Sequence, residues 1–218
     1  ITNVSHDIKT PLTSIISYVD LLKREKIDNP KAVEYINVLD EKSERLKQLI
    51  FDLIDASKVS TGNIELERVD MNLVELIRQV MGEYEDKFEE KNLELVDNIT
   101  VDSAVINADG RRIFRVFDNL MGNVYKYAKE DTRVYLNLGM SENSDRVIVS
   151  IKNISSEMLN ISAEELTERF VRGDKSRYTE GSGLGLSIAR NLVELHGGTF
   201  KLNIDGDLFT VIVSFAVC

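Results

Sequence analysis

Two short runs of residues carry side chains and spacings suited to moving a phosphoryl group. The first places His6 beside Asp7 and four residues before Thr10. An imidazole offers an unprotonated nucleophilic nitrogen near neutral pH, and a neighbouring carboxylate can accept the proton of the other ring nitrogen and orient the ring. The second run, Gly181-Ser182-Gly183-Leu184-Gly185-Leu186, is typical of a loop whose free N–H groups receive phosphate oxygens at a helix start. Together they indicate transfer of a phosphoryl group from a nucleotide to His6.

A third group of polar residues fits the nucleotide itself. Asn119 and Asn123 are four residues apart and share a helical face, so their amide oxygens can approach one hydrated Mg²⁺ that bridges the phosphates. Lys126 can add positive charge, and Tyr127 can offer a flat surface to adenine. Tyr125 is better explained as an aromatic packing residue. His196, just before Gly197-Gly198, is expected to cap or pack a helix end rather than to act in catalysis.

These residues need two kinds of structural element to hold them. Apolar residues recur at three and four positions from Val4 to Leu22 and again from Val33 to Ile54, which predicts two amphipathic helices. Asn29 is expected to cap the second helix, with Pro30 as its first residue. Pro11 lies inside the first helix and predicts a bend there. The apolar stripe is too wide for one hairpin to cover, so we expect a homodimer in which two hairpins form a four-helix bundle.

After Ser60-Thr61-Gly62-Asn63 the pattern changes, which predicts a domain boundary. We expect a hairpin over residues 1–61, a linker over 62–70 and a second domain over 71–218. Helices and mostly antiparallel strands alternate in that domain, so the fold class is α+β with a sandwich architecture. The elements expected there are helices 73–87, 111–127 (capped by Asp109) and 184–195, strands 93–99, 105–108, 134–138 and 147–151, and a terminal hairpin of 199–204 with 209–215.

Composition excludes several classes of function. The 218 residues are 43% hydrophobic and carry a net charge of −10, so the surface would repel nucleic acid and anionic lipid. Cys218 is the only cysteine, which leaves no intrachain disulfide or thiolate zinc cluster and fits a reducing cytosol. No stretch approaches the roughly 18 apolar residues of a membrane span. Because the sequence begins at Ile1, we expect it to be a piece of a longer protein.

Four blocks of the chain, in the right order, resemble the sequence boxes of sensor histidine kinases of bacterial two-component systems. The blocks are Ser5 to Pro11 for the H box, Asn119 to Tyr127 for the N box, Glu168 to Asp174 for the F box and Gly181 to Leu186 for the G2 box. The resemblance covers essentially the whole chain. It implies a two-helix phosphoacceptor and dimerisation hairpin followed by a Bergerat-type ATP-binding domain.

The resemblance also implies an activity and its residues. The chain would autophosphorylate His6 from Mg-ATP and pass the group to an aspartate of a response regulator, with Asp7 assisting His6 and Thr10 orienting water for a phosphatase reaction. Asn123, and with it Asn119, would hold Mg²⁺. The other ATP-binding residues would be Lys126, Tyr127, Arg172, Gly181, Gly183, Leu184 and Gly185, with residues 171–180 as a lid. The chain would be the cytoplasmic portion of a protein located at the cell membrane.

The family's G1 box, an Asp followed two and four residues later by glycines, is absent. Asn153 stands where the adenine-reading aspartate would be, and Ser155 where the first glycine would be. Exchanging a charge-assisted hydrogen bond for a neutral one costs on the order of 1 kcal/mol, or several-fold in affinity. An Asn amide can still accept from the adenine 6-amino group while donating to a ring nitrogen. Asp207-Leu208 also replaces the family's usual Gly-Thr pair.

Two other functions remain open on the sequence alone. The missing G1 box allows a weak or inactive kinase that serves as a dimeric scaffold and phosphatase. A Bergerat-type ATPase of the chaperone or DNA-repair kind would share the nucleotide blocks, but the His6 hairpin and the acidic composition argue against it.

Overall fold

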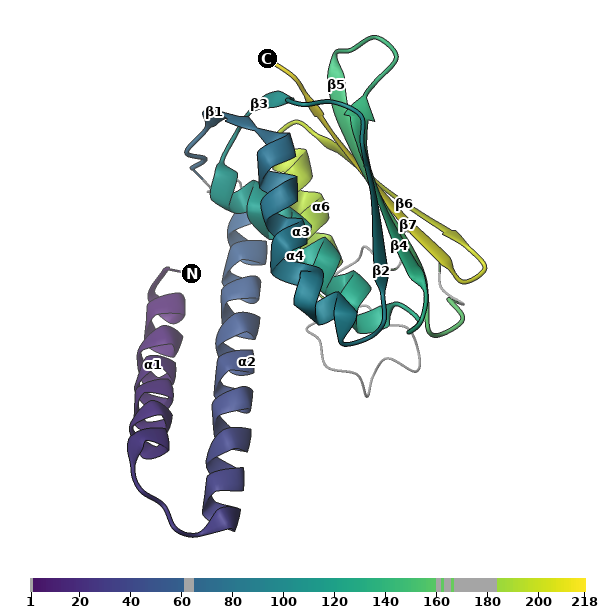
Figure 1. The fold of residues 1–218 in the computed structure, drawn as a ribbon. Coiled ribbons are helices and arrows are strands. Elements are labelled where there is room, and N and C mark those ends of the chain that lie inside the picture. The colour runs from purple at the N-terminus through teal and green to yellow at the C-terminus, as the bar shows by residue number, and fades with distance from the viewer. Residues whose placement is uncertain (1, 61–64, 160–161, 163–165, 167–183) are drawn as a thin grey trace. The chain divides into compact units, whose positions relative to one another are not determined.

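The computed structural model describes the backbone of residues 2–60, 65–159, 162, 166 and 184–218, with side chains described outside 2–10, 44–45, 48–49 and 51–60. The chain divides into two compact units, Ile1–Thr61 and Gly62–Cys218 (Figure 1). The first unit is a helical hairpin and the second is a mixed α/β domain, which confirms the predicted α+β fold class. No helix in the described part of the chain is both long and apolar enough to cross a membrane.

The hairpin consists of α1 (Thr2–Arg24) and α2 (Pro30–Ser60). The helix continues on both sides of Pro11, as the apolar periodicity predicts. The Oδ1 atom of Asn29 accepts from the backbone N–H of Lys31 at 3.0 Å and of Ala32 at 3.4 Å, which confirms the predicted cap. Pro30 occupies the first helical position, where its missing N–H is not needed.

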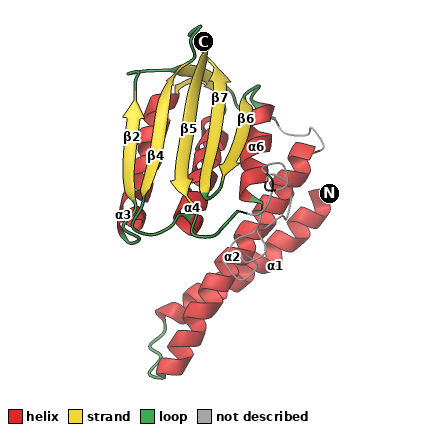
Figure 2. Ribbon diagram, turned by 90° about the vertical axis from the view of Figure 1, so that its right-hand side faces the viewer, coloured by secondary structure: helices red, strands yellow, loops and turns green. Residues whose placement is uncertain are grey.

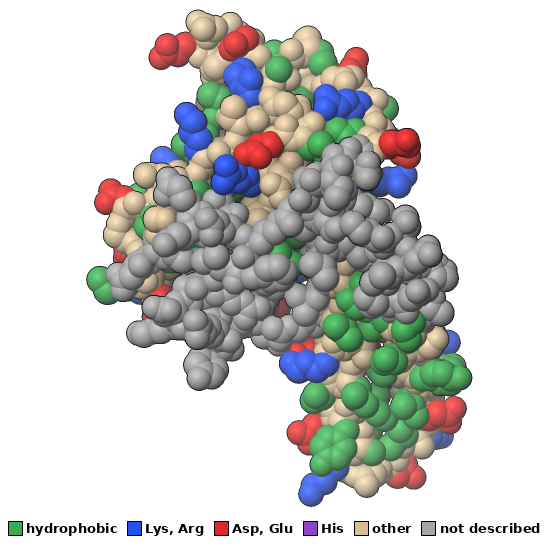
Figure 3. All heavy atoms as spheres, turned by 180° about the vertical axis from the view of Figure 1, so that it is seen from behind, with side chains coloured by type: hydrophobic (Ala, Val, Ile, Leu, Met, Phe, Trp, Pro, Cys, Tyr) green, Lys and Arg blue, Asp and Glu red, His purple; other side chains and the backbone are tan. Residues whose placement is uncertain are grey.

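Only part of the apolar stripe of the hairpin is covered within one chain. Among the described side chains, Leu12, Val19 and Ile36 are buried between the two helices. Hydrophobic side chains also gather on the open surface of the hairpin (Figure 3). The large apolar side chains that stay exposed are Ile15, Tyr18, Leu21, Leu22, Val33, Tyr35, Val38, Leu39 and Leu46.

The second unit is a two-layer sandwich. Its main sheet has five strands in the order β2-β4-β5-β7-β6, and only β2 and β4 are parallel. Three helices, α3, α4 and α6, lie on one face of this sheet (Figure 2). The elements are β1 (Val69–Asn72), α3 (Leu73–Glu89), β2 (Glu94–Ile99), β3 (Val105–Ala108), α4 (Gly110–Tyr127), β4 (Arg133–Met140), β5 (Arg146–Ile154), α6 (Gly185–Leu195), β6 (Thr199–Asp205) and β7 (Leu208–Ala216).

The core lies between the sheet and the helices, as binary patterning requires. Every second residue of β5 is buried, beginning at Val147, so that these side chains face the helices. On α4 the buried residues recur at three and four positions and form one apolar face. That face consists of Ile113, Val116, Phe117, Leu120, Met121 and Val124.

One strand is absent from the sequence prediction. β1 pairs with β3 in a separate two-stranded antiparallel sheet, with Val69 opposite Ala108. It contains Val69 and Asp70, which lie within the linker predicted over residues 62–70. Both side chains are exposed, so β1 lacks the alternation by which a strand is recognised in sequence. β3 has its predicted bounds, and the other strands differ from theirs by one to three residues at an end.

Two glycines explain how α6 turns into β6. Gly197 has φ 74°, a conformation that favours glycine after a helix. At Gly198 an added Cβ would lie 2.7 Å from the carbonyl oxygen of Ser214 on β7. The glycine pair therefore lets the chain leave the helix and approach the sheet closely.

Candidate active site

The start of α4 is fixed by a buried acidic cap. The Oδ1 atom of Asp109 accepts from the backbone N–H of Arg112 at 3.3 Å, as predicted for the N-cap. Its Oδ2 atom accepts from the backbone N–H of Glu67 at 3.3 Å and lies 3.6 Å from the Nε atom of Arg112. The cap therefore joins α4 to the segment that precedes β1 and sets where the N-box residues fall along the helix.

The helix α3 braces one side of α4. Tyr84 donates its hydroxyl hydrogen to Asp118, whose Oδ1 and backbone oxygen lie 2.8 and 3.0 Å away. Burial, aided by the hydrogen bond to Asp118, raises the pKa of Tyr84 above its usual value. An added Cβ at Gly122 would lie 3.1 Å from the same hydroxyl, so the two helices are in close contact there. Asn119 directly follows Asp118 on α4, and Asn123 directly follows Gly122.

Asn119 connects the N box to the G2 box. Its Nδ2 atom donates to the carbonyl oxygen of Arg115 at 2.9 Å. Its Oδ1 atom lies 3.3 Å from the Cβ that a larger residue would add at Gly185. The structure thus brings an amide oxygen of α4 to the first residue of α6, across a separation of 66 residues (185 minus 119).

The start of α6 presents backbone donors. Leu184 is buried at the N-cap position and makes no side-chain capping hydrogen bond in the described structure. Its carbonyl oxygen accepts from the hydroxyl of Ser187 and from the backbone N–H of Ile188. The first N–H groups of the helix therefore have no side-chain cap, which suits an anion at the positive end of the helix dipole.

Tyr125 and Tyr127, at the end of α4, have different surroundings. The hydroxyl of Tyr125 donates to the Oε2 atom of Glu90 at 3.1 Å, and the Nζ atom of Lys91 lies 4.9 Å from the centre of the Tyr125 ring. These contacts tie α4 to the end of α3 and support the packing interpretation of Tyr125. Tyr127 is half-buried, and Lys126 is exposed. Both remain available to a ligand.

Asn153 continues the inward-facing row of β5 and is only 3% exposed. Its partners on the flanking strands are Val134 and Phe209. Its Nδ2 atom donates to the carbonyl oxygen of Ile154 at 3.2 Å. Its Oδ1 atom has no hydrogen-bond donor among the residues that the structure describes. A buried acceptor of this kind is costly to leave unpaired, so it points to a ligand donor.

Ser155 and Asp207, which both depart from the family pattern, contact each other. The backbone N–H of Ser155 donates to the carbonyl oxygen of Asp207 at 2.7 Å, and its hydroxyl oxygen accepts from the backbone N–H of Glu157 at 3.3 Å. The backbone N–H of Ser156 donates to the carbonyl oxygen of Tyr127 at 2.8 Å. The segment that replaces the G1 box is therefore tied to both the β6–β7 turn and the end of α4. Sequence spacing gives no indication of these contacts.

Both ring nitrogens of His196 form hydrogen bonds with backbone groups. Its Nδ1–H donates to the carbonyl oxygen of Leu192 at 2.7 Å, and its Nε2 atom accepts from the backbone N–H of Asp109 at 3.2 Å. Burial lowers the pKa of His196, and the nearby Arg68 and Arg112 act in the same direction. The neutral ring therefore links the end of α6 to the cap of α4. This agrees with the capping or packing role expected from the sequence.

Several predicted site residues lie outside the described parts of the chain. Arg172, Gly181 and Gly183 are among them. The backbone of α1 places His6, Asp7 and Thr10 within its first half, but their side chains are not described. In the described part of the chain, no group of three or more His, Cys, Asp or Glu side chains could hold a metal ion.

Family models match both units. Residues 1–62 match the His Kinase A (phospho-acceptor) domain, and residues 108–216 match the histidine kinase-, DNA gyrase B- and HSP90-like ATPase. The sensor histidine kinase WalK of Bacillus subtilis is 29% identical over 201 residues, which are 91% of this chain and 33% of that protein. The sensor protein kinase WalK of Staphylococcus aureus is 30% identical over 208 residues, 93% of this chain and 49% of that protein. The chain thus spans between a third and a half of these relatives.

Solved structures share the fold of this chain. Full-length ShkA in complex with AMPPNP superposes with a TM-score of 0.83 at 24% identity, over all of this chain and 46% of that one. Histidine kinase ThkA in complex with the response regulator protein TrrA gives 0.64 at 24% identity, over all of this chain and 60% of that one. The catalytic domain of ThkA gives 0.60 at 26% identity, over 69% of this chain and 95% of that one. From its two matched domains and its fold, the chain belongs to the sensor histidine kinases.

Proposed function

We propose that this chain is the ATP-dependent kinase core of a two-component sensor. It binds Mg-ATP in the second unit, transfers the terminal phosphoryl group to His6 and passes it to an aspartate of a response regulator. The observation that carries the proposal is the approach of Asn119 Oδ1 to Gly185 at the uncapped start of α6. An amide oxygen beside the start of a helix, where the helix dipole is positive, suits a triphosphate that carries a magnesium ion.

The nucleotide is held from three directions. The backbone at the start of α6, at Leu184 and Gly185, contacts phosphate oxygens, as helix starts do. Lys126 supplies positive charge, and the Tyr127 ring lies against the base. Asn153 reads the base from the sheet. Arg172, Gly181 and Gly183, which lie outside the described residues, complete the phosphate contacts.

The amide oxygens of α4 fit a magnesium ion. Asn119 already donates its Nδ2 hydrogen to Arg115, so its Oδ1 atom is the group that points toward the start of α6. Oxygen is the ligand that Mg²⁺ prefers, and the ion usually completes its shell with water and phosphate. Asn123 lies one turn further along the same helix. When bound, the ion neutralises charge on the phosphates during transfer.

The transfer needs positioning more than covalent machinery. An unprotonated ring nitrogen of His6 attacks the γ-phosphorus, the bond to the β–γ bridging oxygen breaks, and ADP leaves with the electron pair. Asp7 accepts a hydrogen bond from the other ring nitrogen and stabilises the ring as it becomes positive. The phosphoryl group then moves from His6 to a carboxylate oxygen of the regulator. Thr10, one turn beyond His6, orients the water that removes the phosphoryl group from the regulator's phosphoaspartate.

Two partners complete the proposal. The exposed apolar side chains of the hairpin support a homodimer through a four-helix bundle, because a second copy would cover them. The similar kinase ThkA was solved in complex with the response regulator TrrA, which supports a receiver domain as the second partner. Both sensor relatives are much longer than this chain, in keeping with a cytoplasmic core whose full protein is at the membrane.

Labelling with γ-³²P-ATP tests the proposal. The native chain should acquire an acid-labile label, and His6→Gln should lose it. His196→Gln is the matched control, because it alters the other histidine of the chain and should retain the label. Absence of label from a native chain that binds ATP would favour the scaffold and phosphatase alternative. Label that persists in His6→Gln would place the acceptor elsewhere.

A further inference from the structure

Asn153 carries the one buried side-chain oxygen of the described residues that has no hydrogen-bond donor. We propose that Asn153 selects the base of the nucleotide through this oxygen alone, because the carbonyl of Ile154 fixes the amide in one orientation. It follows that a base with an amino group at position 6 is preferred, and that an aspartate cannot replace Asn153 without loss. The inference rests on the proposed function, since it concerns the nucleotide of the same site.

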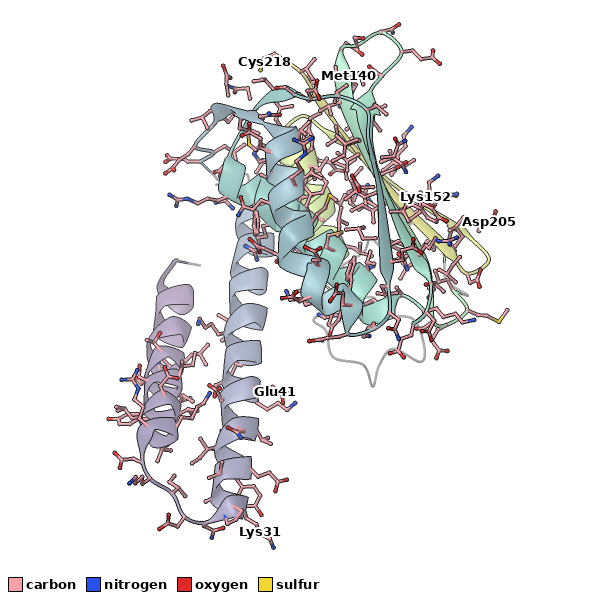
Figure 4. All side chains as sticks on the ribbon, in the orientation of Figure 1. Lys31, Glu41, Met140, Lys152, Asp205 and Cys218 are labelled. Carbon is pink, nitrogen blue, oxygen red and sulfur yellow. The ribbon has the colours of Figure 1, made fainter. Side chains whose placement is uncertain are left out.

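The alternation of side chains along β5 shows which face of the sheet Asn153 lies on. Lys152 points away from the helices (Figure 4), and neighbouring residues of a strand point to opposite faces. Asn153 therefore faces the helix side, where Val147, Val149 and Ile151 are buried in the same row. Its strand partners Val134 and Phe209 are apolar. The unpaired oxygen thus lies at the end of an apolar row and not on the open face of the sheet.

The carbonyl of Ile154 determines the orientation of the amide. The Nδ2 atom of Asn153 lies 3.2 Å from this oxygen and donates to it. Rotating the amide by half a turn would place Oδ1 there instead, and two acceptors would face each other without a hydrogen. At 3% exposure, no bulk water is present to relieve that contact. The side chain is neutral, yet it offers an acceptor to the ligand.

An acceptor in this position discriminates between purines. Adenine carries a 6-amino donor that can pair with Oδ1, whereas guanine and hypoxanthine carry a 6-oxo acceptor that cannot. A buried acceptor left unpaired, or facing another acceptor, loses about 10- to 100-fold in affinity. The neutral amide therefore provides the selectivity for adenine that a carboxylate provides in the family's usual sequence.

An aspartate in this environment behaves differently from the amide. One carboxylate oxygen would face the ligand, but the other would lie against the Ile154 carbonyl with no hydrogen between them. The charge would also be buried among apolar neighbours, which favours the protonated acid. Only the protonated acid has a hydrogen to donate to Ile154. We therefore expect Asn153→Asp to imitate the native residue at low pH and to fail at higher pH.

The test is equilibrium binding of three triphosphates to the whole chain by calorimetry. ATP has a 6-amino group, purine riboside triphosphate has none, and ITP has a 6-oxo group. The native chain should bind ATP about 10- to 100-fold more tightly than ITP, with purine riboside triphosphate between them. Asn153→Leu, which keeps the approximate size, should bind ATP and purine riboside triphosphate within about twofold of each other.

Two further variants make the result specific. Asn153→Asp should bind ATP more weakly than the native chain at pH 7.5, and the ratio of the two affinities should approach one at pH 5.5. Taking this ratio at each pH cancels the protonation of the triphosphate. Asn137→Leu is the matched control, because Asn137 is half-buried on the opposite face of the sheet and donates to Ser150. It should leave the ATP to ITP ratio unchanged.

The outcomes separate the two proposals. If Asn153→Leu folds, as circular dichroism would show, and keeps the native ATP to ITP ratio, the role of Asn153 is wrong while the kinase proposal stands. ATP binding by Asn153→Asp at pH 7.5 that is as tight as that of the native chain, or tighter, would also overturn it, because the carboxylate would then bind the base as well as the amide does. If the native chain binds none of the three triphosphates, both the inference and the proposed function fail.

Discussion

The two units of this chain differ in how completely each covers its own apolar surface. In the described part of the hairpin, three apolar side chains are buried, and nine large ones are exposed. In the described part of the second unit, the exposed large apolar side chains are only Val69, Val105, Tyr135 and Met158. The sheet and its helices therefore cover their own apolar side chains, whereas the hairpin leaves an apolar surface exposed to solvent.

This contrast has a physical origin. A sheet covered by three helices encloses side chains between two layers, whereas two helices in contact can bury only the residues along one seam. Burying each remaining large apolar side chain would contribute about 1.5 to 3 kcal/mol. We therefore expect the hairpin to gain most of its stability on association, and the ATP-binding unit to have its stability within one chain.

The largest expected effect comes from placing charge on the open surface of the hairpin. In Leu22→Asp with Leu39→Asp, a dimer loses four buried leucines and gains four charges. At about 1.5 kcal/mol for each leucine, association should weaken by about 6 kcal/mol or more, roughly 10⁴-fold. Sedimentation equilibrium should show a dimer for the native chain and a monomer for the variant.

Tyr135→Asp is the matched control for this variant. Tyr135 is 41% exposed, close to the 43% of Leu22, but it lies on β4 of the second unit. It should leave the native oligomeric state unchanged. If Tyr135→Asp dissociates the chain and the hairpin variant does not, the association surface lies on the sheet and the contrast between the units is reversed.

Local rules were sufficient to predict most of the elements. Asn29 and Asp109 were identified as caps because a side-chain acceptor precedes an amphipathic run, and the structure confirms both. Long-range contacts were not predictable in this way. The backbone N–H of Asp109 donates to His196, a residue 87 positions away, and no spacing rule connects them. β1 was missed because its partner β3 lies far along the chain and its first side chains are exposed.

The candidate site shows the same division. Helical spacing placed Asn119 and Asn123 on one face, but it gave no reason for Asn119 to meet Gly185. Only the resemblance to a family assigned both residues to one ATP site. The orientation of Asn153 depends on a carbonyl oxygen of its own strand, and the sequence shows only that an amide replaces an acid there. The roles of these residues stay predictions until binding and labelling are measured.

A smaller effect is expected from acid, and it should fall on the second unit alone. Burial lowers the pKa of His196, so the folded unit keeps this imidazole neutral. Above the ordinary value of about 6.5, neither the folded nor the unfolded chain is protonated at this position, and stability is full. Below it the unfolded chain binds a proton, so the free energy of unfolding falls by at most about 1.4 kcal/mol per pH unit.

Thermal unfolding of the whole chain between pH 7.5 and 5.5 measures this effect. The transition of the second unit should move to lower temperature as the pH falls, and His196→Gln should reduce that slope. Glutamine retains an acceptor for the N–H of Asp109 but cannot be protonated. Equal slopes in the two proteins would show that burial and the charges of Arg68 and Arg112 do not keep the ring neutral against the opposing effect of Asp109.

The smallest effect tests whether the two units unfold independently. Asn29→Ala removes the acceptor for the N–H groups of Lys31 and Ala32 at the start of α2. Because this cap is exposed, the loss should be about 0.5 to 1 kcal/mol, at the low end for N-caps. Calorimetry should show a lower transition temperature for the hairpin, at a fixed chain concentration because association contributes to it, and no change for the second unit. A shift of both transitions would mean that the stability of the ATP-binding unit is not independent of the hairpin.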